Sequence, residues 1–332
     1  MSIPKSRLLE FLNRLNQILE RAIPVLIPAG VALGIALPAY LILLRPLIPW
    51  FFATITLAGA LKLRARELGR TLTSPLPFFI FFFSARVFMP VIVFFLSSLI
   101  FRNDPDTVSG YVLLYSVPTA VTGFIWVSIF RGDSALALAL ILLDTILAPL
   151  VVPGTVRILL GASIRLDMTG LAVSLIYMIV IPTIVGVTLN EVSRGKIPAL
   201  ISPYLNPFSK ICMALMVSAN SAAIAPQIKP DNPRLWIIII TCISFSVFSF
   251  IWARFSGLAG KLKRDKQISL FFTAGLRNTG AAMTLGIEFF PGPAALPAVL
   301  GIMFQQITAA IMGRIFLGKI GSESTASKEA AM

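Results

Sequence analysis

Long apolar stretches recur along almost the whole chain, separated by short polar or charged loops. A helix needs about 20 apolar residues to cross the hydrocarbon core of a membrane, and most of these stretches reach that length. The pattern predicts an all-α polytopic membrane protein with ten transmembrane helices, at residues 22–44, 46–63, 75–101, 109–130, 133–160, 168–190, 207–227, 234–253, 267–289 and 292–317. Several stretches are longer than this minimum, so we expect some of the helices to be tilted or broken.

The fourth and ninth predicted helices contain residues that a continuous transmembrane helix disfavours. The fourth contains SVPTAVTGFIW, with Pro118 and Gly123, and the ninth contains GLRNTG, with Arg277 and Asn278. Non-helical backbone at membrane depth is tolerated only where it is buried in protein or lines a watery cavity. We therefore expect two broken helices, and such a pair points to the binding site of a transporter. For the fourth helix alone, an ordinary proline kink is an equally good interpretation.

Ten helices divide into two halves of five, and an odd number per half inverts the second half relative to the first. Thr122-Gly123 is followed by GDSAL, and Thr279-Gly280 is followed by GPAAL, so each broken helix is the fourth of its half. Chance similarity between helices rich in Ala, Gly and Leu is the alternative. The predicted organisation is a five-helix repeat at 1–160, an inverted repeat at 161–318 and a disordered cytoplasmic tail at 319–332.

The composition fits a membrane protein, because 57% of residues are hydrophobic and only 13% are charged. The net charge of +14 does not indicate a nucleic-acid partner, since the basic residues lie in short loops that alternate along the chain. Most of them fall on one side of the predicted topology. This bias predicts a multi-pass membrane protein with both termini in the cytoplasm. We expect residues 1–21, with Arg7, Glu10 and Arg14, to form an amphipathic segment before the first span and not a cleavable signal.

The polar residues exclude some kinds of chemistry. The sequence has no histidine, so it offers no histidine-based metal site, catalytic triad or proton relay. Cys212 and Cys242 lie in apolar segments, where we interpret them as small packing residues. No metal site, cofactor or enzymatic activity is expected. A channel or sensor scaffold without a transport cycle stays open as an alternative to a transporter.

Three ionisable side chains are predicted to lie deep in the membrane: Arg86, Asp144 and Arg277. A buried charge is expensive, so we expect Asp144 to pair with an arginine. Two arginines against one aspartate leave one positive charge unmatched, for which an anionic substrate is the natural complement, unless Arg86 reaches the membrane interface. Arg277 is either a fixed charge at a substrate or ion site, or part of a structural salt bridge.

Gln305 and Gln306, in the tenth helix, are adjacent and therefore point about 100° apart. One of them can face the broken helices while the other packs elsewhere. Contacts that only hold helices together are the alternative role for this pair.

Three segments of the chain are distinctive as a set: VPTAVTGFIWVSIFRGDSALALALILLDTILAPLVVP, GLRNTGAAMTLG and PAALPAVLGIMFQQITAA. Together with RVFMP in the third span, they resemble the bile acid:sodium symporter family, in its bacterial branch, which implies a protein of the bacterial inner membrane. The resemblance covers essentially all ten spans. It implies inverted repeats, with helices one, two, six and seven as a panel, the others as a core, and helices four and nine unwound and crossing. It also implies cotransport of sodium with an organic anion, which binds between core and panel.

The resemblance assigns a substrate site to residues at the two breaks and in the tenth helix. The asparagine of the family matches Asn278, its polar pair matches Gln305 and Gln306, and its backbone contacts match Val121 and Thr122. We expect these residues to meet, with Arg277 close enough to set the charge of the site.

The sodium ligands of the family are not retained in this sequence. The family has a glutamate at Thr273 and a glutamine at Arg277, and a third-helix glutamine near Ala85. Its remaining ligands fall on Gly123, Phe124, Ala137 and Ile141, and Thr145 is the nearest hydroxyl that could substitute. We therefore expect that sodium is not used as in the family and that Arg277 replaces the ion, which makes uniport or exchange the first hypothesis. A sodium-coupled symporter with altered ion sites is the alternative.

Overall fold

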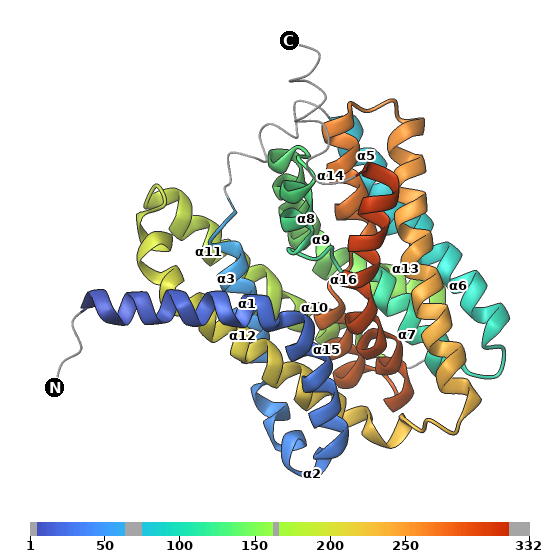
Figure 1. Ribbon diagram of the computed structural model, residues 1–332. Coiled ribbons are helices and arrows are strands. Elements are labelled where there is room, and N and C mark those ends of the chain that lie inside the picture. Colours follow the sequence, from blue (N-terminus) through green and yellow to red (C-terminus); the bar gives the residue numbers. More distant parts are fainter. Residues whose placement is uncertain (1–4, 64–74, 162–165, 319–332) are drawn as a thin grey trace.

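The computed structural model describes residues 5–63, 75–161 and 166–318, and helices make up nearly all of these ranges (Figure 1). The residues 319–332, predicted as a disordered tail, lie outside the described part. The helices of the first half are α1 (Lys5–Ala36), α2 (Pro38–Leu41), η1 (Ile42–Leu47), α3 (Ile48–Ala60), α5 (Pro75–Phe82), η2 (Phe83–Phe88), α6 (Met89–Ile100), α7 (Pro105–Ser116), α8 (Gly123–Ile129) and α9 (Ser134–Leu160). Those of the second half are α10 (Met168–Leu175), η4 (Ile176–Val180), α11 (Ile181–Val192), α12 (Lys196–Ile224), η5 (Ala225–Gln227), α13 (Pro233–Ala259), α14 (Arg264–Gly275), α15 (Thr279–Phe289), η6 (Gly292–Ala295) and α16 (Leu296–Leu317).

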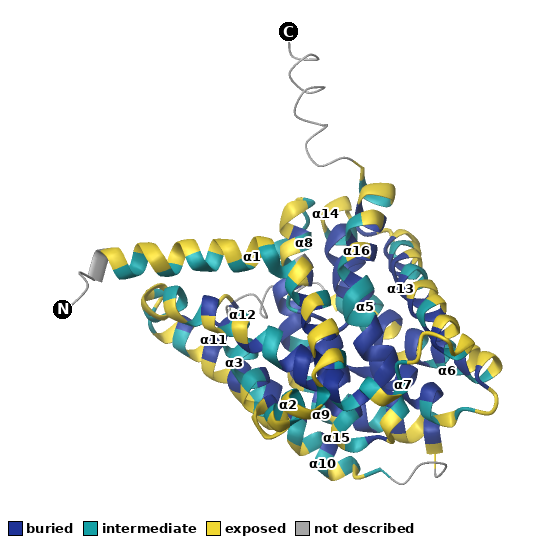
Figure 2. Cartoon of the chain, turned by 60° about the horizontal axis from the view of Figure 1, so that its bottom comes forward, coloured by how far each residue is buried: buried dark blue, intermediate teal, exposed yellow. Residues whose placement is uncertain are grey.

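The described helices are those of a multi-pass membrane protein. Among the described residues, seven helical stretches are long and apolar enough to cross a membrane, and an eighth is added if the bent helix α1 is counted. Many large apolar side chains on the outer surface are exposed, including Leu43, Leu150 and Ile158 (Figure 2). In a soluble protein such a surface would drive aggregation, whereas in a bilayer it faces lipid.

The fourth and ninth predicted spans are each divided into two shorter helices. Helix α7 ends at Ser116 and α8 begins at Gly123, while α14 ends at Gly275 and α15 begins at Thr279. Val117, which precedes Pro118, is extended, as the ring of a following proline favours.

Two predicted boundaries were wrong. The first and second spans were divided near Arg45, but the chain turns at Leu37 and a new helical stretch begins at Pro38. The seventh span was predicted to begin at 207, yet α12 begins at Lys196 and continues through two prolines. Its start is set instead by Gly195, whose φ of +85° is a left-handed conformation that ends the turn after α11.

The helices form two groups, which are separated in Figure 1. In one group α1 packs along α12, α12 packs against α3, and α3 packs against α11. In the other, α13 packs against α14 and α16, α6 packs against α7, and α8 and α9 contact α14. Helix α15 contacts members of both groups, so the second helix break lies where the groups meet.

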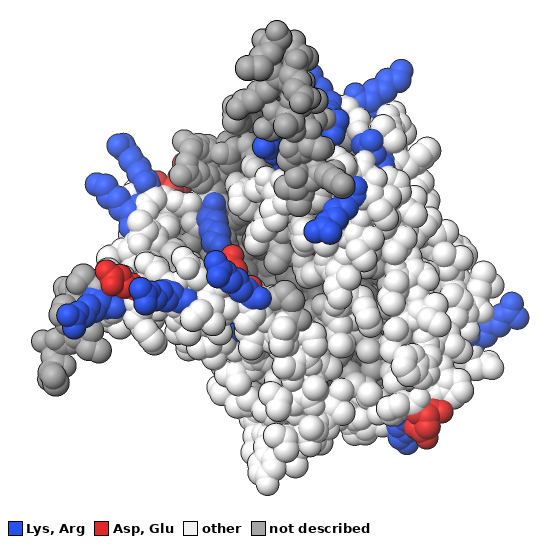
Figure 3. Space-filling model, viewed as in Figure 1, with Lys and Arg blue, Asp and Glu red and all other residues white. Residues whose placement is uncertain are grey.

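On the face drawn in Figure 3 most of the lysine and arginine side chains gather toward one end of the molecule, and a few lie at the opposite edge beside an acidic group. A broad uncharged surface lies below them in that view. This separation of charged and apolar surface is typical of a protein that spans a bilayer.

Gly110 in α7 is required for the close approach of α7 to the turn η6. A Cβ atom at this position would overlap the backbone carbonyl of Ala294, which cannot move independently of the chain. We predict that Gly110→Ala destabilises the protein by about 1–3 kcal/mol, as overpacking does. The measurement is the melting temperature of the purified protein in detergent. Gly154→Ala is the matched control, because no atom lies within 4 Å of a Cβ there; equal melting temperatures for the two variants would contradict the packing argument.

Candidate functional site

The two helix breaks lie against each other and satisfy part of each other's backbone. The backbone N–H of Asn278 donates to the carbonyl of Pro118 at 2.8 Å. The Thr119 hydroxyl lies within hydrogen-bond distance of the carbonyl oxygens of Leu276, at 3.0 Å, and of Thr273. Ser249 from α13 donates to the carbonyl of Gly275 at 2.9 Å. Helix-end carbonyls have no partner within their own helix, so these donors allow both helices to end inside the protein.

Arg86 and Asp144 form a buried ion pair beside the first break. Their side chains are about 1% exposed each. Arg86 also donates to the carbonyl of Val117, at 2.8 Å, and to that of Ser116, and Asp144 accepts the backbone N–H of Thr119 at 2.7 Å. The pair therefore holds the unwound segment after α7 through both its carbonyl and its amide groups. Arg86 is buried in this pair, so its side chain does not extend to the membrane interface, and that alternative explanation of the excess positive charge is wrong.

Arg277 is buried at the second break, with 1% of its surface exposed. Its guanidinium donates to the carbonyls of Leu276, at 3.3 Å, and Ala85, at 3.1 Å, and lies 5.9 Å from the centre of the Tyr115 ring. Ala85 belongs to the π-helical segment η2, where the regular hydrogen-bond pattern is interrupted. Among the described residues no carboxylate forms an ion pair with Arg277, and its Nε has no hydrogen-bond partner.

A cavity of about 420 Å³ lies between the two groups of helices, next to the breaks. Its polar wall comes from the two breaks and α16, and its apolar wall comes from the opposite group, through Ile27, Phe52, Ile55, Met213 and Met216. All six residues predicted to bind substrate line it: Val121, Thr122, Arg277, Asn278, Gln305 and Gln306. The backbone of the Arg277–Gly280 segment forms part of this wall, whereas the guanidinium points to the carbonyls behind it.

The polar side chains of the cavity differ in how many of their hydrogen-bonding atoms are already bonded to other protein groups. Gln306 accepts from the Trp126 indole N–H at 2.8 Å and donates to the Thr122 hydroxyl at 3.2 Å. Gln305 makes no side-chain hydrogen bond within the described part of the chain. Asn278 uses its Oδ1 to cap α15, accepting the N–H of Ala281 at 3.1 Å, so its Nδ2 is left over. The groups available to a ligand therefore include the Gln305 amide and Asn278 Nδ2.

The positions that the family uses for sodium hold few oxygen atoms here. Gly123, Ala137 and Ile141 have none in their side chains, and Phe124 packs in an apolar cluster with Leu138 and Leu142. The hydroxyl groups of Thr145 and Thr273 donate to carbonyls of their own helices, Ile141 at 2.7 Å and Ser269 at 2.8 Å. Thr145 lines the cavity and Thr273 does not. Among the described residues no group of three or more His, Cys, Asp or Glu side chains could hold a metal ion.

Sequence reasoning placed the Thr119 hydroxyl beside the first break but missed Trp126 and Ser249. Trp126 follows Thr122 by four residues, a spacing that puts both on one helix face, and this signal was available. Ser249 gave no such signal, because its partner Gly275 belongs to a different helix.

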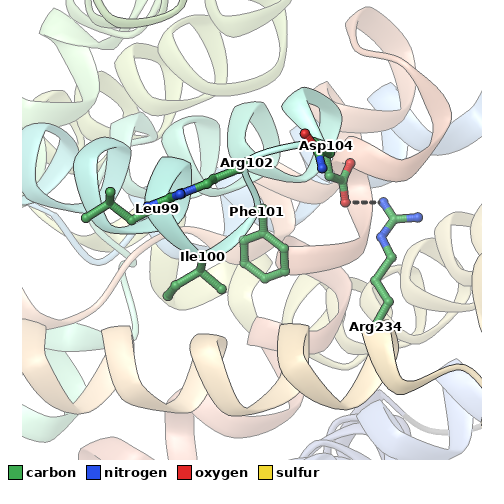
Figure 4. Close-up of a pocket in the computed structure, with 7 residues that line it drawn as sticks. Leu99, Ile100, Phe101, Arg102, Asp104 and Arg234 are labelled. Atoms are coloured by element: carbon green, nitrogen blue, oxygen red, sulfur yellow. Dashed lines mark ion pairs between the residues drawn. The ribbon is translucent and has the colours of Figure 1, made fainter.

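A second hollow, of about 460 Å³, lies at the surface around the loop between α6 and α7 (Figure 4). An ion pair between Asp104 and Arg234 joins this loop to the start of α13, and the Arg102 side chain points away from that pair. The hollow brings together no further polar side chains from different helices, so it is a weaker candidate for a site than the cavity at the breaks.

Comparisons with known proteins identify the family of this chain. The profile described as "Sodium Bile acid symporter family" matches residues 49–229. The "Uncharacterized protein YbaS" of Bacillus subtilis (strain 168) is 38% identical over 290 residues, which are 87% of this chain and 95% of that protein. The "Probable sodium/metabolite cotransporter BASS1, chloroplastic" of Arabidopsis thaliana is 23% identical over 92% of this chain and 76% of its own. The "Uncharacterized sodium-dependent transporter YocS" of Bacillus subtilis (strain 168) is 18% identical over 89% and 91%.

The protein is therefore a multi-pass membrane protein of the transporter class, and not an enzyme. It belongs to the sodium bile acid symporter family, as its sequence predicts.

The buried pair of Arg86 and Asp144 leads to a prediction about stability. Asp144→Asn leaves the Arg86 guanidinium buried without a counter-charge, which costs about 3–5 kcal/mol. We predict a large fall in the melting temperature of the protein in detergent. The control is Glu20→Gln, because Glu20 pairs with Lys210 at 3.3 Å but its side chain is 59% exposed. Such a pair contributes at most about 1 kcal/mol. An Asp144→Asn variant as stable as the Glu20→Gln variant would show that the ion pair does not hold the break.

Proposed function

We propose that this protein is a secondary transporter of a small organic anion. The observation that carries the proposal is the cavity where the two breaks meet, which is lined by uncommitted amide groups and by the amino end of α15. A helix amino end carries partial positive charge and attracts anions. Asn278 Nδ2 and the Gln305 amide can donate to a carboxylate there, while Gln306, held by Trp126, positions Thr122.

The proposal includes the finer architecture that the sequence predicts. The ten spans are the stretches described above together with the broken spans α7–α8 and α14–α15, arranged as inverted repeats at 1–160 and 161–318. The group of α1, α3, α11 and α12 corresponds to a panel, and the group of α7, α9, α13, α14 and α16 to a core. Transport then proceeds by movement of core against panel around the cavity, in an inner membrane with both termini cytoplasmic.

Arg277 is proposed to replace a sodium ion of the family. The resemblance assigns both Arg277 and the region of Ala85 to ion binding, and here the guanidinium of the first donates to the carbonyl of the second at 3.1 Å. A cation at about 4 Å from a guanidinium would be opposed by roughly 4 kcal/mol at an effective dielectric constant of about 20. That is nearly a thousandfold in affinity. The cycle is accordingly uniport or exchange.

Coupling to protons through Asp144 is disfavoured by its contacts. Its two oxygens are engaged by Arg86 and by the Thr119 amide, so protonation would break a buried ion pair.

The first test starts from a thermal-shift screen of carboxylate metabolites, with and without sodium, to find a ligand. We then predict that Asn278→Ser and Gln305→Ala each weaken its binding about tenfold or more, since a lost charge-assisted hydrogen bond costs about 1.5–3 kcal/mol. Serine offers a hydroxyl oxygen that can cap α15 but lacks the longer amide group, so Asn278→Ser removes the Nδ2 donor and keeps the cap. Isothermal titration measures the change. Normal binding by both variants would place the site elsewhere.

The second test addresses sodium. We predict that the ligand accumulates in preloaded proteoliposomes by exchange, at equal rates in sodium, potassium or choline at constant ionic strength. The double variant Thr273→Glu with Arg277→Gln restores the two family residues and is predicted to make binding sodium-dependent, while Arg277→Gln alone is the control. A saturable sodium dependence of the unaltered protein would overturn the proposed role of Arg277. If the internal concentration of the ligand never exceeds the external concentration under exchange conditions, the result favours the channel alternative.

A further inference from the structure

The first part of α1 carries an exposed stripe in which arginine and large apolar residues alternate. Arg7, Arg14 and Arg21 are exposed, and between and after them Phe11, Ile18 and Val25 are 61%, 63% and 69% exposed. The spacings of four and three residues keep a side chain on one helix face. At about 100° per residue, the five positions from Arg7 to Arg21 lie within a band of roughly 80°.

Helix α1 bends where this stripe ends. The segment Arg7–Ile23 makes an angle of 72° with Val25–Ala36, and position 24 between them is a proline. Val25–Ala36 packs along α12, one of the stretches that can cross a membrane. Membrane-crossing helices are tilted by only about 20° on average, so a segment at this angle to one of them runs close to the membrane plane. Figure 1 shows the segment projecting sideways from the rest of the protein.

The two flanks of this segment face different surroundings. On one side the Lys210 ammonium group of α12 contacts Glu20, at 3.3 Å, and Asn16, which ties the segment to the protein. The arginine-containing stripe lies on the far side of the helix from that attachment, at roughly 140° from Glu20 and 180° from Asn16, at 100° per residue. Asn13 and Gln17 occupy the remaining polar face. The stripe is therefore part of the face that the rest of the described chain leaves exposed, together with Glu10, Asn13 and Gln17.

We propose that residues 7–23 lie in the interface of the cytoplasmic leaflet and bind anionic phospholipid headgroups. Arginine offers a planar set of donors that matches a phosphate group, and Phe11 and Ile18 reach the boundary of the acyl chains. Interfacial helices with basic residues beside an apolar face bind in this way, and the affinity rises with the negative charge of the lipid. Because Glu20 and Ile23 line the cavity between the two groups of helices, the docked segment also forms the cytoplasmic lip of that cavity.

The test uses the full-length protein reconstituted in vesicles of phosphatidylcholine with or without phosphatidylglycerol. A polarity-sensitive NBD fluorophore is attached at Ile18→Cys or, as the matched control, at Asn13→Cys, in a background with Cys212→Ala and Cys242→Ala. Both positions are exposed and lie roughly 140° apart on the helix. We expect blue-shifted emission and strong quenching by doxyl-labelled lipid at position 18, and neither at position 13.

The role of the arginines is tested with Arg7→Gln and Arg14→Gln in the Ile18→Cys protein. Each lost charge is expected to lower the ratio of docked to undocked segment about fivefold in phosphatidylglycerol vesicles and to change little in phosphatidylcholine alone. These side chains are exposed, so the variants should fold, which size-exclusion chromatography checks.

Three results would overturn the proposal. They are equal quenching at positions 13 and 18, quenching that does not depend on anionic lipid or on the arginines, and disulfide-linked dimers of Ile18→Cys in place of lipid quenching. The last result would assign the stripe to contact with a second copy of the chain.

Discussion

The structure depends on hydrogen bonds to backbone carbonyls at two helix ends that are buried within the protein. In lipid or in a dry interior, each unsatisfied backbone group costs several kcal/mol, so helices rarely end there. Here Arg86 donates hydrogen bonds to carbonyl oxygens at the end of α7. The carbonyl oxygens at the end of α14 accept hydrogen bonds from Thr119, Ser249 and Arg277. Unwound backbone thereby becomes a stable part of the core, and its amides and nearby side chains become available to the cavity.

The charges at the two breaks are not equivalent. Arg86 is matched by Asp144, so the first break is held by a neutral pair. Within the described part of the chain, Arg277 donates only to neutral carbonyl groups and faces the ring of Tyr115, so the second break is held by a positive charge without a paired carboxylate. Carbonyl dipoles at a helix carboxyl end stabilise such a charge in part. The part of the positive charge that these dipoles do not compensate favours an anion in the adjoining cavity and opposes a second cation.

The sequence predicts the breaks because the cause is local. Pro118 and Gly123, and the pair of Gly275 and Gly280, violate the preferences of a helix wherever they occur. The partners of the breaks were less accessible, because they come from distant helices. The contact of Arg277 with Ala85 depends on the π-helical segment in the third span, and the commitment of Gln306 to Trp126 depends on how α8 packs against α16. The turn at Leu37 and the continuation of α12 through Pro203 and Pro207 were missed because tertiary packing overrides the local preference.

The proposed role of Arg277 has a consequence for the transport cycle that a bound ion would not have. A sodium ion can leave, so an empty carrier of the family can return without its charge. A guanidinium is tethered, so the empty carrier keeps one uncompensated positive charge beside the cavity throughout the cycle. Without a bound anion, movement of this charge is opposed because the charge is poorly solvated. With a carboxylate bound beside it, the part that moves has a net charge close to zero. Exchange of one anion for another is then easier than net transport, because neither direction requires the empty carrier to reorient.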